Sequence, residues 1–342
     1  MKYIVDIPVE LAKKVDSLVN RGKYESISQF ANTAFQNQLL LEESPKETLE
    51  SLIETPISKL KLTPVKSQLL ISNLGINFNP ESIRTVDPPD ASKIPNDCLW
   101  GQYNRIFPVK IALRILANML KDDETVELDL LHAQAVQAAR EVGLLLKKED
   151  KKSKRKYGDL LSTALPIGRD LAKTEKRFMN HFVGYYTRAG RIEGAPGALK
   201  FLSISEDEEN VQRVGITESG LHFAAFANSV LDEGNFKTTL NKEESLFYIK
   251  NVFENLPREK ELNVLILRAI EKEKASPEDL NKAILPLSRG WSDAMVNTMK
   301  AGAISRLNEL GLISRSRRGF VVNYSLTDFG MDILSNNTEK GA

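Results

Sequence analysis

Apolar residues recur at two different spacings along the first 43 residues. Apolar and polar side chains largely alternate over residues 2–7, which predicts a short strand. Beyond Pro8 the apolar residues recur every three or four positions, which predicts a helix that ends at Gly22 and a second helix capped by Ser28. Strand, helix and helix in so short a stretch cannot bury a core alone, so we expect residues 1–43 to associate with a second copy.

The pattern breaks down over residues 44–98. Seven of the fourteen prolines fall in this stretch. Proline fixes the backbone angle φ and removes an N–H donor, so it interrupts regular structure. We therefore expect a proline-rich, mostly extended linker here.

Helical spacing returns beyond the linker and predicts two further domains, residues 99–231 and 242–335. A polar hinge separates them, and residues 336–342 are expected to form a disordered tail. The sequence thus predicts a mainly α fold with small β elements. The predicted helices cover residues 107–120, 128–146, 169–188, 217–230, 243–255, 259–271, 276–284 and 292–310 and one that starts at 327; the predicted strands cover 201–204, 213–216, 313–315 and 320–325.

Composition narrows the class of protein. The chain has 342 residues, with 47 lysines and arginines against 46 aspartates and glutamates, so the net charge is +1. This balance excludes a uniformly basic nucleic-acid coat and an acidic disordered chain. The single cysteine, Cys98, excludes an intrachain disulfide and a four-cysteine zinc site. With no signal peptide and no long apolar run, we expect a cytoplasmic protein without a membrane span.

Motifs of enzymes are not found in the sequence. The chain has no phosphate-binding glycine loop, and residues 194–197 (GAPG) are typical of a turn. The three histidines, His132, His181 and His222, do not have the spacing of metal ligands. We therefore expect a protein that is not an enzyme, with no cofactor and no bound metal.

Residues 1–43 resemble the ribbon-helix-helix family of DNA-binding proteins. The resemblance rests on residues 5–12 (VDIPVELA) and 28–34 (SQFANTA), with Gly22 between them. It implies an intertwined homodimer whose paired strands enter the major groove of double-stranded DNA. It also implies that the N–H groups near Ser28 hold a phosphate. The groove-facing residues would be Lys2, Ile4 and Asp6, where the family usually has basic or small polar side chains.

Residues 242–335 resemble a winged-helix domain. The matching stretches are 306–313 (RLNELGLI) and 324–330 (YSLTDFG), in which a long helix ends at glycine, a hairpin wing follows and a threonine caps the next helix. The resemblance implies that the long helix reads DNA and that the wing touches the minor groove or phosphates. The candidate DNA-binding residues are Ser292, Asn297 and Lys300 on the helix and Arg315, Arg317 and Arg318 on the wing. The alternative interpretation of the wing is a solvated charged turn.

Residues 99–231 are interpreted as a diverged repeat of that domain. Residues 214–220 (VGITESG) align with 324–330, and we aligned Gly190 with Gly311. The interval from Gly190 to Thr217 is 27 positions, against 16 from Gly311 to Thr327, so this alignment predicts a wing longer by 11 residues. The acidic run of the insert would repel phosphate.

Together these features predict a sequence-specific DNA-binding transcription regulator that acts as a dimer, associated with the nucleoid. The first alternative is a structural or partition protein that marks a DNA site and recruits a protein partner. A plasmid replication initiator is a further alternative, although the ribbon module would be surplus there.

Overall fold

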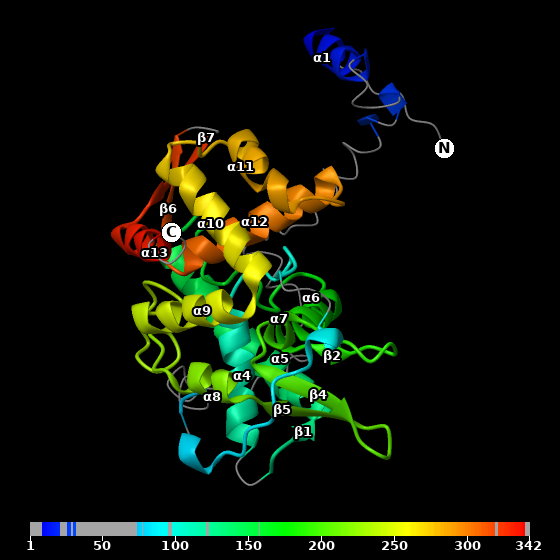
Figure 1. The fold of residues 1–342 in the computed structure, drawn as a ribbon, viewed down its shortest axis with the longest axis vertical. Helices are drawn as coiled ribbons and strands as arrows, with labels where there is room; N and C mark the ends of the chain where they lie inside the picture. The colour runs from blue at the N-terminus through cyan, green and yellow to red at the C-terminus, as the bar shows by residue number, and fades with distance from the viewer. Residues whose placement is uncertain are drawn as a thin grey trace. The chain divides into compact units, whose positions relative to one another are not determined.

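A computed structural model of the chain describes residues 9–20, 26–28, 30–31, 74–76, 78–94, 98–120, 123–156, 158–318 and 321–338. The chain divides into two compact units, residues 1–63 and 64–342 (Figure 1). Each unit is described by itself.

The first unit contains helix α1, Val9–Asn20, in which Val15 is buried. A helical turn follows near Ser28, and its first backbone bond runs from the Phe30 N–H to the Ser26 carbonyl at 3.0 Å. Ser28 is therefore an exposed residue inside the turn, and the serine at its start is Ser26. Lys2, Ile4 and Asp6 lie outside the described residues, so the ribbon-helix-helix interpretation stays a prediction.

The second unit is mainly helical with small antiparallel sheets, which confirms the predicted fold class at this level. Most helices that the apolar spacing predicts in this unit appear within two residues of the expected bounds. The helix predicted over residues 128–146 instead runs on to Lys152, and the helix predicted over 217–230 already ends at Ala225. The helix expected over residues 169–188 ends at Val183, where Gly184 has a φ of 110°, and two short strands follow. The helices are α4 Phe107–Met119, α5 Leu128–Lys152, α6 Leu171–Phe178, the π-helix η5 Met179–Val183, α7 Ala195–Ala198, α8 Glu218–Ala225, α9 Lys242–Asn255, α10 Pro257–Glu271, α11 Pro277–Ile284, α12 Asp293–Glu309 and α13 Asp328–Thr338.

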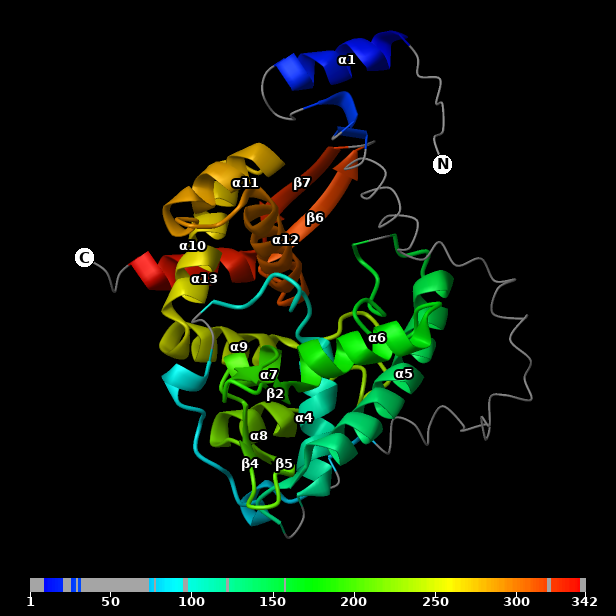
Figure 2. The same ribbon diagram turned by 90° about the vertical axis from the view of Figure 1, so that its right-hand side faces the viewer.

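The strands form three separate sheets. Strand β5 lies between β1 and β4, and the other two sheets are the hairpins β2–β3 and β6–β7. Figure 2 shows β6 and β7 side by side. In the β4–β5 hairpin Leu202 pairs with Ile216, and in the β6–β7 hairpin Ile313 pairs with Leu326. The bounds are β1 Val126–Glu127, β2 Tyr185–Tyr186, β3 Ile192–Glu193, β4 Leu202–Glu206, β5 Gln212–Ile216, β6 Ile313–Arg318 and β7 Val321–Leu326.

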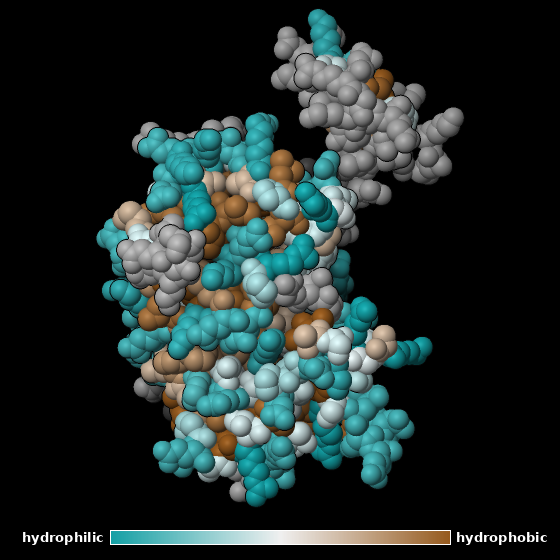
Figure 3. All heavy atoms as spheres, in the orientation of Figure 1, coloured by the Kyte–Doolittle hydropathy of each residue, from teal (hydrophilic) through white to brown (hydrophobic). Residues whose placement is uncertain are grey.

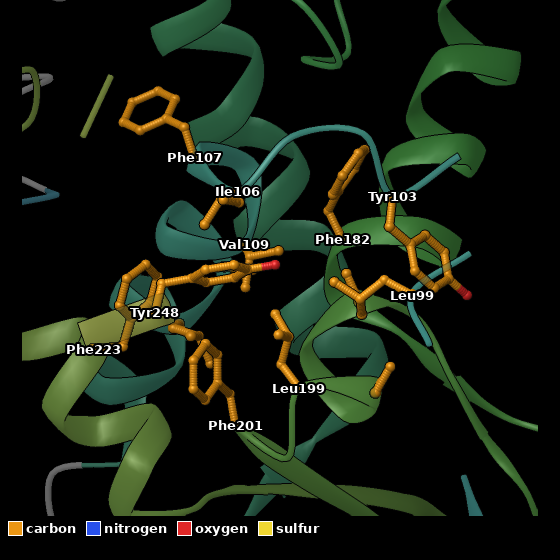
Figure 4. Close-up of a cluster of buried hydrophobic side chains, with 14 of the residues drawn as sticks. Leu99, Tyr103, Ile106, Phe107, Val109, Phe182, Leu199, Phe201, Phe223 and Tyr248 are labelled. Carbon is orange, nitrogen blue, oxygen red and sulfur yellow. The ribbon is translucent and has the colours of Figure 1, made fainter. Parts of the chain in front are cut away.

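Helix α4 lies at the centre of the core. Nearly all of its residues are buried, including Phe107, Val109 and the two cations Lys110 and Arg114. Figure 4 shows Phe223 from α8 and Tyr248 from α9 in the cluster of apolar side chains beside this helix. An all-round apolar helix needs such cover on every side.

Buried contacts of charged side chains join the two regions that the sequence separates into domains. Lys110 pairs with Glu244 at 2.8 Å, and neither side chain is exposed. Arg306 pairs with Glu259 at 2.7 Å and also donates to the Tyr103 carbonyl at 2.8 Å. The predicted domains at 99–231 and 242–335 therefore share one continuous core within the second unit.

Part of the expected linker belongs to that core as well. Leu74, Phe78 and Ile83 are buried. The Val86 N–H donates to the Ile216 carbonyl at 2.9 Å, so the segment is held along strand β5. The expectation of a linker throughout residues 44–98 is wrong here because these apolar side chains find a place in the core. At the other end of the unit, α13 continues past the predicted boundary at residue 335.

The structure changes the alignment of residues 99–231 with residues 242–335. The Phe201 N–H donates to the Pro196 carbonyl at 2.9 Å, and Leu312 donates to Leu307 at 3.0 Å, so the two helices end in the same cap. Lys200, with a φ of 60°, occupies the position of Gly311, with a φ of 73°. Aligning Gly190 with Gly311 was therefore wrong.

The hairpins that follow the two caps have nearly equal lengths. From Lys200 to Thr217 is 17 positions, against 16 from Gly311 to Thr327, so the difference is one residue and not eleven. Gly190 instead lies in the turn of the β2–β3 hairpin, where its N–H donates to Thr187. The extra length of residues 99–231, the second region of the chain, thus precedes the wing and does not lie in it.

On the face drawn in Figure 3, hydrophilic side chains are interspersed with apolar areas. None of the helices in the described part of the chain has both the length and the apolar character needed to cross a bilayer.

Candidate nucleic-acid interface

Helices α11 and α12 form a helix-turn-helix whose sequence explains both starts. Ser276 and Ser292 are the N-caps, and each accepts from a backbone N–H three residues on, Asp279 at 3.1 Å and Met295 at 3.3 Å. Between the helices Gly290 has a φ of 83°, a conformation that glycine adopts without strain. Ile284, Val296 and other apolar residues of the pair are buried, which fixes the two helices against each other.

The beginning of α12 is open to solvent on its outer side. Ser292, Asp293, Ala294 and Asn297 are exposed. Asn281 of α11 donates to the Asn297 side-chain oxygen at 3.2 Å, which leaves the Asn297 amide protons directed elsewhere. Because this oxygen also accepts from Lys300, the group that Asn297 can offer to a base edge is its amide N–H donor. Two of the predicted groove-facing residues, Ser292 and Asn297, therefore lie together as expected from the spacing.

Lys300 differs from that expectation. It is only 8% exposed, and its ammonium donates to the Pro277 carbonyl at 3.1 Å and to Asn297 at 3.4 Å. Burial lowers the pKa of this ammonium from its usual value. The side chain thus fastens α12 to the start of α11 instead of lying on the outer face, because position 300 falls on the inner side of the helix.

The wing arginines have different surroundings. The Arg315 guanidinium lies 3.6 Å from the Asp159 carboxylate, and its side chain packs over Gly158. It is mostly buried, whereas Arg317 is exposed. The backbone of Arg318 ends strand β6, and its side chain lies outside the described part of the structure. Arg315 therefore connects the wing to the loop after α5, which sequence spacing could not reveal.

Basic residues near the helix-turn-helix were missed in the sequence. Lys282 and Arg289 are exposed on α11 and in the turn before α12. Arg258 lies over the Trp291 ring, 5.8 Å from its centroid, and donates to the Leu287 carbonyl at 3.2 Å. The sequence signal for Arg289 was its position next to Gly290, directly before a helix cap, which places a cation at the exposed helix start.

The electrostatic character of this face is mixed. The N–H groups at the start of α12 and the nearby Arg289 favour an anion, such as a phosphate. Asp293 in the first turn of α12 opposes one. A phosphate contact is thus better placed beside the turn than on the axis of α12.

Metal binding finds no support in the described ranges, where no group of three histidine, cysteine, aspartate or glutamate side chains comes together. Comparison of the chain with protein-family models, with curated proteins and with solved structures gave no match.

Proposed function

We propose that this protein is a sequence-specific DNA-binding regulator of transcription that acts as a dimer. The observation that carries the proposal is the exposed start of α12, with Ser292 and Asn297 on its outer side and Arg289 in the preceding turn. A helix presented in this way, beside a two-stranded wing, has the size and the polar groups to enter a major groove.

The division of roles follows from the chemistry of these side chains. Asn297 suits base recognition, and Arg289 and Arg317 suit phosphate contact. Dimerisation through residues 1–43 is part of the proposal, because a two-fold protein reads two half-sites and so gains affinity and specificity.

Binding to a randomised duplex library tests the proposal. Asn297→Ala should cost about 1–3 kcal/mol of discrimination at one base pair, whereas Arg289→Ala should weaken binding to all sequences and reduce the salt slope by about one. Lys250→Ala removes an exposed cation from α9 and serves as the matched control, with both quantities unchanged.

A protein without measurable affinity for duplex DNA at low salt would contradict the proposal. If the protein binds duplex DNA, a genome-wide binding map distinguishes transcription regulation from the partition alternative. Occupied promoters support transcription regulation, and a single array of repeated sites supports the partition alternative.

A further inference from the structure

A cavity of about 330 Å³ lies in residues 98–198, apart from the helix-turn-helix. Its walls come from the segment before α4, from the π-helix η5, from the β2–β3 hairpin and from α7. The lining residues are Cys98, Trp100, Tyr103, Asn180, His181, Tyr185, Ile192, Glu193, Gly194 and Ala198.

Close backbone contacts build the back of this cavity. Gly184 and Gly194 both have a positive φ, of 110° and 116°. A Cβ on Gly194 would lie 2.6 Å from the Gly184 Cα, so only glycine allows the π-helix and α7 to approach so closely. The Gly194 N–H donates to the Tyr103 hydroxyl at 3.1 Å, which fixes that ring in the wall. The cavity is therefore shaped by rigid backbone.

The wall combines aromatic rings with one carboxylate. Trp100 and Tyr185 are 37% and 36% exposed, unusual for such large rings, while Tyr103 is buried. Glu193 is the one acidic side chain of the lining. The exposed Arg191, two residues before it, offsets part of its charge and acts to lower its pKa, but does not line the cavity. Rings with negative faces around a carboxylate attract an organic cation.

The other titratable groups of the wall do not compete for that charge. His181 lies edge-on to Tyr103, with 5.6 Å between ring centroids, and burial lowers its pKa to about 4, so the ring is neutral. Burial raises the pKa of the Glu193 carboxyl, which means that its negative charge is poorly solvated. A cation in the cavity would stabilise that charge.

We propose that this cavity binds a small organic ammonium cation, held by Glu193 and by the rings of Trp100, Tyr103 and Tyr185. A bare metal ion fits less well, because it requires several oxygen ligands and the wall offers one carboxylate. The proposal does not depend on DNA binding, since the cavity and the helix-turn-helix have no lining residue in common.

The experiment uses the full chain and the fluorescence of Trp100. The chain has two tryptophans, so Trp291→Phe leaves Trp100 as the reporter. Choline chloride is titrated at constant ionic strength, and 3,3-dimethylbutan-1-ol, its uncharged counterpart of the same shape, is titrated in parallel. We expect a saturable change with choline and about tenfold weaker binding of the alcohol.

Three variants assign the binding to the cavity. Glu193→Gln should weaken choline binding about tenfold and leave the alcohol unchanged. Tyr185→Phe should keep choline binding, and Tyr185→Leu should lower it several-fold. Glu208→Gln, at an exposed acidic position in the β4–β5 turn, is the matched control and should change nothing.

Circular dichroism of each variant establishes that it is folded. Equal affinity for choline and for the alcohol would overturn the proposal, as would no saturation with either probe. Tighter binding of adenosine than of choline would also overturn it, and would identify a stacking site for a nucleobase.

Discussion

Residues 99–231 and 242–335, the second and third regions of the chain, have the same structure at their C-terminal ends and differ before it. In both, a helix closes with the same cap, a hairpin of nearly equal length follows, and a threonine, Thr217 or Thr327, starts the next helix and accepts from the N–H of Gly220 or Gly330. Ahead of the cap, the third region has α12, of 17 residues, and the second has α7, of four. The cap, the hairpin and the next helix are common to both regions. The candidate sites lie at the helices that differ, α12 in the third region and α7 in the second.

The largest expected effect concerns the contact that joins the two regions. Arg306→Met leaves the Glu259 carboxylate buried without its guanidinium and should lower the free energy of unfolding by about 3–5 kcal/mol. Arg268→Met, at an exposed position on α10, should change it by less than about 0.5 kcal/mol. Urea unfolding followed by circular dichroism measures both. Separate transitions, with only one of them shifted, would show that the regions unfold independently.

The next effect tests whether the shared ends are equivalent. A Cβ at Gly220 would lie 1.9 Å from the Phe201 carbonyl oxygen, and one at Gly330 would lie 2.0 Å from that of Leu312. Gly220→Ala and Gly330→Ala should therefore each destabilise the protein by about 1–3 kcal/mol. Ser219→Ala is the neighbouring control. A large loss for one glycine and none for the other, in thermal unfolding, would break the comparison.

A smaller effect is confined to the cavity of the second region. The pKa of His181 is lowered to about 4 from an ordinary 6.5, so between these values the unfolded chain takes up a proton that the folded chain does not. Stability should fall as the pH drops through this window. After allowance for partial exposure of the ring, the loss is about 1–2 kcal/mol.

His181→Phe isolates this contribution, because it removes the titration and keeps a ring beside Tyr103. The stability difference between pH 7 and pH 4.5 should be smaller in the variant by that amount, measured by urea unfolding at the two values. The same pH dependence in both proteins would mean that the imidazole has the same pKa in the folded and the unfolded chain.

The smallest effect exchanges the caps. Lys200 holds a φ of 60°, a strained value for a side chain with a Cβ, so Lys200→Gly should stabilise the protein by up to about 1 kcal/mol. Gly311→Ala should cost about 1 kcal/mol from backbone strain alone, because a Cβ there meets no atom within 4 Å. The calorimetric melting temperatures of the two variants should move in opposite directions. A shift in the same direction for both would show that positions 200 and 311 are not equivalent cap positions.

The sequence predicts those elements that are fixed by local physics. Apolar spacing together with serine at helix starts locates α9 to α12 within a few residues, since helix periodicity and capping act between near neighbours. The same local signal places Ser292 and Asn297 on the outer side of α12.

The remaining features depend on contacts between distant segments. Lys300 and Arg315 look like surface cations in the sequence, and only the positions of Pro277 and Asp159 show what they bind. A lysine in the place of the cap glycine concealed the true alignment of the repeat, because Gly190 offered the expected residue type. The cavity needs residues 98–103 to meet residues 180–198, and no periodicity encodes that contact.

The segment of residues 98–103 lies between the cavity and helix α12. Trp100 and Tyr103 line the cavity, while a Cβ on Gly101 between them would lie 2.2 Å from the Thr298 carbonyl oxygen of α12. A molecule that displaces this segment therefore displaces the backbone of α12 or is resisted by it. Such coupling is reciprocal: the factor by which an occupied cavity changes the affinity of α12 for DNA equals the factor by which DNA changes the affinity of the cavity for its occupant.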